Sequence, residues 1–425
     1  MLERYIKEAT ALQRYRSGPL GGFTDVLAVR FHERGYSPGS ICNLLHGIGH
    51  LNRYLVQRGI GHVGEMRPEH IASFLKDHLP NCACGHPNKG VFRGAPAAVR
   101  HTIEYLREQN LLRGFETAEP SPDSVDGVLK RLDAYLGKVR GLSKSTRVHH
   151  RIVAKRFLDS RHNRFGALKL AEMTSAEVLD YSREALTAPW SLGTKKGVLG
   201  HLRLFLRFLW WERILNRDLS RAVPSVIQWR LADVPKHLPF KKVRLLLNTP
   251  DTDTPMGKRD RAIMMLLALL GLRAGEVAAL KLDHVHWREG RLTVPRAKAS
   301  RQRSLPLPSE AARALADYLQ HGRPKTQNRA LFLRCRAPIM PLSPNAVTHL
   351  VRHNTRRAKI TGTLHTGSHV LRHSLATLLI NKGVPVKQIS DILGHADIRS
   401  TCIYTKVDVR RLSEVARPFP ALKEN

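Results

Sequence analysis

The chain has 425 residues, which is too long for one compact core and predicts two or three domains. Its 70 lysines and arginines against 35 aspartates and glutamates give a net charge of +35. Because the basic residues are spread along the whole chain, the excess indicates a polyanionic partner, most often nucleic acid, that contacts several domains. A basic protein without such a partner is the minority interpretation.

The composition also argues against membrane insertion and secretion. The longest apolar run, Ala262 to Leu272, is 11 residues between two arginines, too short to cross a bilayer, so it predicts a buried helix. The first ten residues carry charges where a signal peptide would be apolar. The five cysteines form no disulfide framework, so we expect a cytoplasmic protein with no membrane partner.

Helix signals in the N-terminal half occur twice in the same order. A helix start at Ser37-Pro38 is followed by a second start just after Glu65, and similar starts recur at Ser143 and after Glu172. The offsets are 106 and 107 residues, which predicts two related four-helix units. The alternative is that unrelated helices share the same start signals.

Proline-rich segments suggest the domain boundaries. We predict an N-terminal helical domain at 1–116, a linker at 117–126, a second helical domain at 127–223, a linker at 224–239 and a third domain at 240–425. Within the third domain, two short strands at 291–294 and 304–307 flank a basic turn. The fold class predicted is mainly α with a small antiparallel β-sheet (α+β). Helices are predicted over most of 260–272, 309–320, 344–359 and 369–393.

Phosphodiester chemistry is suggested by the stretch from His369 to Tyr404. His369 and Arg372 lie three residues apart, so one helical turn places them on the same face. Gly383 is expected to end this helix, and a second helix stops at Gly394-His395. A phenol can act as a nucleophile once a base takes its proton, and arginine presents a planar fork to phosphate. The structural alternative is a pair of core helices with surface histidines.

These residues resemble a known family. His369-Val-Leu-Arg372-His373, then Leu393-Gly394-His395 and Tyr404, is similar to the second conserved box of the tyrosine recombinase (phage integrase) family. The segment Leu269–Glu276 resembles the first box, and the resemblance covers roughly residues 125–415. It implies a tyrosine-recombinase catalytic domain preceded by helical core-binding (SAM-like) domains.

The resemblance also implies a role for each residue of the two boxes. Arg273 and Arg372 would clamp the scissile phosphate, with Glu276 holding Arg273 through an i,i+3 pair; a purely structural salt bridge is the alternative. His369 and His395 would flank the phosphate as base and hydrogen-bond donor, and His373 would be a supporting residue. Tyr404 would be the nucleophile that forms a 3′-phosphotyrosyl bond.

A lysine in the basic turn completes the implied set. Lys298 would protonate the leaving 5′ oxygen, because its flexible stem lets one ammonium reach a leaving group. The turn has alanines where the family often has glycine, so Arg296 and Arg301 remain rivals. The residues expected to contact DNA are Arg147, Arg151, Lys155, Arg296, Arg301 and Arg303.

The predicted function is site-specific strand exchange on double-stranded DNA with inverted-repeat core sites, by a homo- or hetero-tetramer acting through a Holliday junction. The resemblance implies no cofactor and no metal, and a bacterial, nucleoid-associated recombinase of a mobile element that can act beside sister recombinases. The alternatives are a non-catalytic DNA-binding protein derived from a recombinase and a type IB topoisomerase. The intact set of implied residues argues against the first.

Cys82-Ala-Cys84-Gly-His86 raises the question of a zinc site. Only three ligands are visible in this motif, and their spacing is not that of a common zinc site. A loop with free thiols is therefore the prediction.

Overall fold

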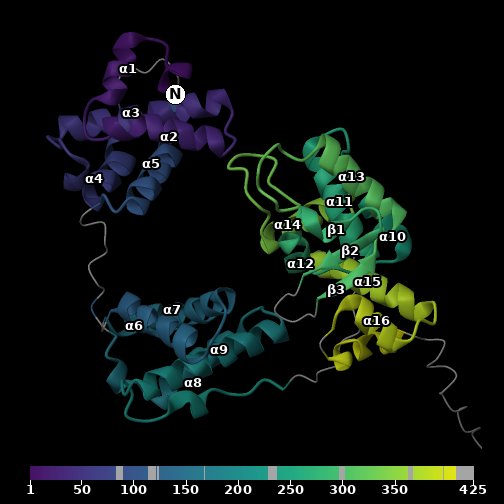
Figure 1. Cartoon of the computed structure of the whole chain (residues 1–425). Helices are drawn as coiled ribbons and strands as arrows, with labels where there is room; N and C mark the ends of the chain where they lie inside the picture. The colour runs from purple at the N-terminus through teal and green to yellow at the C-terminus, as the bar shows by residue number, and fades with distance from the viewer. Residues whose placement is uncertain are drawn as a thin grey trace, which may run out of the picture. The chain divides into compact units, whose positions relative to one another are not determined.

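The computed structural model describes residues 1–82, 90–112, 121, 124–166, 168–227, 237–295, 302–361, 367–395 and 397–407 (Figure 1). The fold is mainly helical with one small antiparallel sheet, as the sequence predicted. By their contacts the residues form two compact units, one of residues 1–62, 74–105 and 233–425 and the other of residues 63–73 and 106–232. The predicted domain boundaries stay a prediction.

The first helices of the chain are α1 (Ala9–Arg16), α2 (Gly21–Glu33) and α3 (Pro38–Gln57), which pack on one another. Ser37 caps α3 as predicted, because its hydroxyl accepts a hydrogen bond from the backbone of Ser40. Gly47 of α3 lies against α5 (Gly90–Glu108), where a Cβ would come within 2.8 Å of Ala98. Between α3 and α5 lie η2 (Val63–Glu65), α4 (Pro68–Ser73) and the π-helical turn η3 (Phe74–His78).

A second helical set consists of α6 (Val125–Ala134), α7 (Lys144–Phe165), α8 (Ser175–Thr187) and α9 (Leu192–Trp211). Its core is built from side chains on all four helices, among them Leu132, Phe157, Val178 and Phe205. The start of η5 (Leu170–Glu172) follows that of η2 by the predicted 107 residues. Helix α6 begins inside the predicted linker 117–126, because Ser124 caps it through the backbone of Gly127.

The remaining elements surround the candidate site. They are α10 (Phe240–Leu247), α11 (Pro255–Leu269), α12 (Ala274–Ala279), β1 (Val285–His286), β2 (Arg291–Val294), β3 (Arg303–Pro306), α13 (Ser309–His321), α14 (Pro344–Arg357), α15 (Ser368–Asn381), α16 (Val386–Leu393), η8 (Ile398–Ser400) and η9 (Cys402–Val407). The three strands pair antiparallel in the order β1-β2-β3, with Leu292 opposite Leu305. The turn 296–301 lies outside the described residues.

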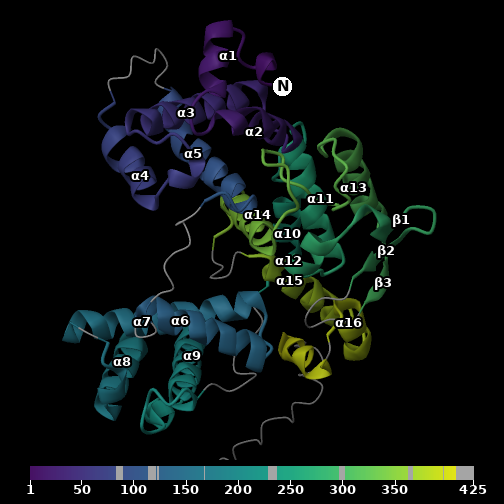
Figure 2. The same cartoon turned by 60° about the vertical axis from the view of Figure 1, so that its left-hand side comes forward.

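Helix α11 is the centre of this region. Every residue from Ala262 to Ala268 is buried, as the apolar run predicted, and the helix packs against α13 and α15. The helix ends at Leu269, slightly earlier than predicted, and Gly271 takes a left-handed conformation. Figures 1 and 2 show α15 leading into α16 beside β3, which places the second motif next to the end of α11.

Among the described residues, no helix is both long and apolar enough to cross a membrane.

Candidate active site

Two glycines allow the first and second motifs to meet. Gly271 has φ +61°, and a Cβ there would lie 2.6 Å from the side chain of Leu393 on α16. Gly394, which follows α16, has φ +62°, and a Cβ there would lie 2.5 Å from Nη1 of Arg303. Both positions therefore need glycine for conformation and for space. As a result, the ends of α11 and α16 come together although Leu269 and Leu393, where the two helices end, are 124 positions apart.

Glu276 holds two arginines at this junction. Its carboxylate is fully buried and accepts bonds from the backbone N–H of Arg273 at 2.9 Å and from Nη1 of Arg273 at 3.0 Å. Arg303 donates to both carboxylate oxygens, at 3.1 and 3.0 Å. Burial alone would raise the pKa of Glu276, but these bonds and charges lower it to about 2. The Arg273–Glu276 pair predicted from the i,i+3 spacing is thus present.

Arg303 has a different position from the one expected of a DNA contact. Besides its bonds to Glu276, its Nε donates to the carbonyl of Ile392 at 3.0 Å, and only 9% of its side chain is exposed. Because β3 points this residue inward, the guanidinium links the sheet to α16. Its described contacts are those of a residue that supports Arg273.

Arg372 is the second arginine of the site and is almost completely buried. It donates to the carbonyls of Gly271 at 2.5 Å and Leu393 at 2.7 Å, so it joins the ends of α11 and α16. Arg273 reaches the same region, with Nη1 3.4 Å from the carbonyl of Gly394. Burial and the nearby Arg273 lower the pKa of Arg372 to about 10, which leaves it charged at neutral pH.

The two histidines predicted to flank a phosphate both lie near these arginines. His369 is exposed in the first turn of α15, and partial desolvation with the charges of Arg372 and Arg273 lowers its pKa. His395 follows Gly394, and its Nδ1 lies 2.6 Å from the hydroxyl of the buried Thr401. Burial and the same arginines lower the pKa of His395 to about 4. Both rings are therefore expected to be neutral near pH 7.

Tyr404 lies on η9 and is only 2% exposed. Its ring packs among apolar side chains of α15 and α16, including Ile380, Ile389 and Leu393. Its hydroxyl lies 2.7 Å from Nδ1 of His373. Burial raises the pKa of Tyr404, and the charges of Arg372 and Arg273 oppose that rise without cancelling it. The phenol is therefore expected to be protonated and held inside the protein at neutral pH.

The contact with His373 was not foreseen from the sequence, which marked this histidine only as a supporting residue. The two residues are 31 positions apart, so no local spacing connects them. The only hint in the sequence that His373 belongs to the site was its position directly after Arg372 on a buried helix. The close contact emerges because η9 packs against α15.

Comparison with known proteins identifies the family. The sequence model of the phage integrase family matches residues 236–411. A Sinorhizobium fredii protein named as an integrase/recombinase, y4rF, is 34% identical over 421 residues, covering 99% of this chain and 96% of that protein. The chain belongs to the tyrosine recombinase (phage integrase) family. The tyrosine recombinase XerD of Ralstonia nicotianae is 36% identical over 216 residues, which is 49% of this chain and 68% of that protein.

Solved recombinase structures share the fold. The XerH site-specific recombinase bound to a palindromic difH substrate matches with a TM-score of 0.52 at 21% identity, over 74% of this chain and 87% of that chain. A lambda integrase dimer bound to a core site matches with a TM-score of 0.53 at 17% identity, over 78% of this chain and 91% of that chain. The chain thus shares the fold of these recombinase structures.

The other residues predicted for this recombinase fall into two groups. Lys298, Arg296 and Arg301 are outside the described residues. On α7, Arg147 pairs with Asp133 at 2.6 Å. The exposed Lys155 pairs with Asp159, and Arg151 is exposed. Their contact with DNA stays a prediction.

Proposed function

We propose that this recombinase carries out site-specific strand exchange on double-stranded DNA through a 3′-phosphotyrosyl intermediate at Tyr404. The observation that carries the proposal is the arrangement of charge beside the phenol. The guanidinium groups of Arg273 and Arg303 bind the single carboxylate of Glu276, and the guanidinium of Arg372 lies close enough to interact with these charges. The cluster keeps a net positive charge next to a buried tyrosine. Such a site suits a phosphodiester as its ligand.

Each step of the proposed reaction keeps bonds and protons in balance. The phenol oxygen of Tyr404 attacks phosphorus and loses its proton to a base, while the bond from phosphorus to the 5′ oxygen breaks. Arg273 and Arg372 stabilise the charge on the nonbridging oxygens, and Lys298 gives a proton to the leaving 5′ oxygen. The phosphotyrosyl bond conserves the bond energy, so a 5′ hydroxyl of a second strand can reverse the step without ATP or another cofactor.

His369 is the proposed base, because its lowered pKa leaves the imidazole neutral and able to accept a proton. His395 is proposed to hydrogen-bond a phosphate oxygen, with its ring oriented by Thr401. His373 acts as a positioning residue, since its Nδ1 fixes the phenol hydroxyl. The high pKa of Tyr404 means that the proton must leave as the phosphorus bond forms.

A mobile element is the proposed context. The match to y4rF extends over 99% of this chain, whereas the match to XerD of Ralstonia nicotianae covers 49%. The N-terminal helices are therefore shared with a protein named as an integrase/recombinase, whereas the match to that XerD extends over only about half of this chain. We further propose that the chain works as a tetramer on inverted-repeat core sites, alone or with sister recombinases, and resolves strands through a Holliday junction.

Covalent capture on a nicked suicide substrate tests the proposal. The wild type should form a protein–DNA adduct, and Tyr404→Phe should form none while binding DNA within a few-fold of the wild type, since one hydroxyl adds little to a large basic interface. An adduct in Tyr404→Phe would move the nucleophile to another residue. A wild type that binds without an adduct would favour the non-catalytic alternative, and relaxation of DNA without a core site would favour a topoisomerase.

A further inference from the structure

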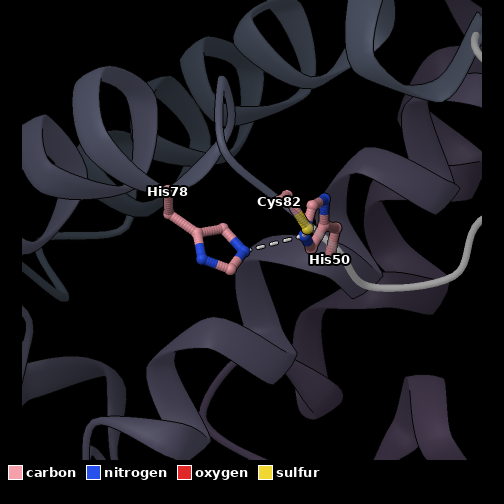
Figure 3. Close-up of side chains that lie close together, drawn as sticks. All are labelled: His50, His78 and Cys82. Atoms are coloured by element: carbon pink, nitrogen blue, oxygen red, sulfur yellow. Dashed lines mark hydrogen bonds between the residues drawn. The ribbon is translucent and has the colours of Figure 1, made fainter.

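Three metal-ligand side chains meet in the N-terminal helices, on elements that the proposed reaction does not use. His50 lies on α3, His78 ends the π-helical turn η3, and Cys82 follows four residues later. The two imidazole Nε2 atoms are 3.0 Å apart, and the sulfur of Cys82 is 3.2 Å from Nε2 of His50. The three ligand atoms all lie within 4.8 Å of one another (Figure 3).

We propose that His50, His78 and Cys82 bind a zinc ion. Zinc takes imidazole nitrogen at about 2.0–2.1 Å and thiolate sulfur at about 2.3 Å in a tetrahedron, so neighbouring ligand atoms stand about 3.3–3.6 Å apart. The observed separations of 3.0 and 3.2 Å are close to this spacing. Small adjustments of the side chains would place all three around one ion. A thiolate with two imidazoles is also a donor set that zinc prefers over magnesium or calcium.

Hydrogen bonds among the three side chains explain the cluster less well than a bound ion does. Nε2 of His50 faces both His78 and Cys82 at bonding distance. A neutral imidazole nitrogen carries either one hydrogen or one lone pair, so it can make one full bond to these two partners at a time. A cation between the three atoms would use a lone pair from each, and deprotonation of the thiol would supply a negative charge.

Aromatic packing holds the two imidazoles in place. The His50 ring meets Phe74 edge-on at 5.3 Å, and the His78 ring stacks on the same Phe74 at 5.6 Å. Tyr54 packs on His78 at 4.9 Å. His50 is 2% exposed and Phe74 is fully buried. Such a shell fixes the rotamers of the two imidazoles before metal arrives, as a metal site requires.

The second helical set provides an internal comparison. His50 is the thirteenth residue of α3, and the thirteenth residue of α7 is Arg156, which is exposed. The residue that follows His78 by the repeat offset of 107 is Ala185. The second set has a histidine pair of its own, His150 and His201 at 3.1 Å, but the sequence places no cysteine in that set. Two histidines together with a cysteine are therefore a particular feature of the first set. In the first set the ion would tie α3 to the chain that follows η3.

The sequence predicted a loop with free thiols here, because the cysteine motif shows only three ligands at an uncommon spacing. His50, which the structure brings to Cys82, is 32 residues away along the chain. Cys84 and His86, the other members of that motif, lie outside the described residues. The proposal uses neither of them. The ion is proposed as a structural link, with no part in strand cleavage.

Elemental analysis of the full-length protein, purified from zinc-supplemented cells without chelator, tests the site. The wild type should contain about one zinc per chain, and His78→Ala and Cys82→Ser should each retain less than about a tenth of that. His62→Ala and Cys42→Ser are matched controls, since they remove an exposed histidine and a cysteine outside the cluster and should keep the wild-type content. Less than about a tenth of an ion in the wild type, or full content in Cys82→Ser, would overturn the proposal.

Cobalt substitution keeps the test informative when a variant folds poorly. Cobalt-loaded wild type should show a thiolate-to-cobalt charge-transfer band, whereas Cys82→His should still bind one ion but lack that band. A wild type without the band, or a Cys82→His variant that keeps it, would refute the ligand assignment. Metal content is measured without DNA, so the outcome is independent of the proposed recombination chemistry.

Discussion

The hydroxyl of Tyr404 is hydrogen-bonded to Nδ1 of His373 at 2.7 Å, and the tyrosine is only 2% exposed. If His373 positions the nucleophile, His373→Ala should slow single-turnover cleavage about tenfold, which corresponds to the loss of roughly one hydrogen bond. His373→Asn places an amide group close to where Nδ1 stood and should restore most of the rate.

The pH dependence of His373→Asn separates positioning from proton transfer. Because asparagine does not titrate, the pH–rate profile should match that of the wild type if His369 is the base. A folded His373→Asn that fails to cleave would make His373 itself the proton acceptor.

The arginine pair gives a second prediction. Arg273→Ala and Arg372→Ala should each reduce cleavage by roughly 10²–10³, because each removes a cation that faces the transition-state phosphate. Arg372→Lys should recover little, since a single ammonium cannot replace the fork that contacts both Gly271 and Leu393. Arg329→Ala, which breaks an exposed pair with Asp283, is the matched control. Near-normal cleavage by Arg273→Ala or Arg372→Ala would refute the clamp.

Glu276 predicts a pH dependence of stability. The pKa of Glu276, about 2, lies below its ordinary value of 4.5. The ionised carboxylate therefore contributes to the free energy of unfolding in full above about pH 4.5, and this contribution is lost as the pH falls toward 2. The contribution is at most about 3 kcal/mol. Urea unfolding of Glu276→Gln should show lower stability at pH 7 and a weaker pH dependence below 4.5. Asp283→Asn, which alters an exposed ion pair, should change both quantities little.

Lys298 is tested by the leaving group. Lys298→Ala should cleave an ordinary core site slowly but should be rescued by a 5′-phosphorothiolate, whose sulfur leaves without a proton. Arg296→Ala and Arg301→Ala should show no such selective rescue. Rescue of either of these variants in place of Lys298→Ala would transfer the role of general acid to that arginine.

Local features of this recombinase could be predicted from the sequence because the interactions that fix them involve neighbouring residues. Ser37 caps α3 through an atom three residues away, and Gly383 and Gly394 take left-handed conformations where helices end. The bond between Arg273 and Glu276 follows from their spacing on one turn. In the same way, the apolar run before Gly271 predicted a helix buried on every side.

Contacts between distant residues were decided only by the tertiary structure. Arg303 binds Glu276 across 27 residues because β3 turns its side chain inward, which the composition of a basic turn could not reveal. The cluster of His50 with Cys82 spans 32 residues and depends on the π-helical turn that directs His78 toward α3. Such pairs depend on how whole elements pack, and a sequence pattern of period two or 3.6 carries information about one face of one element only.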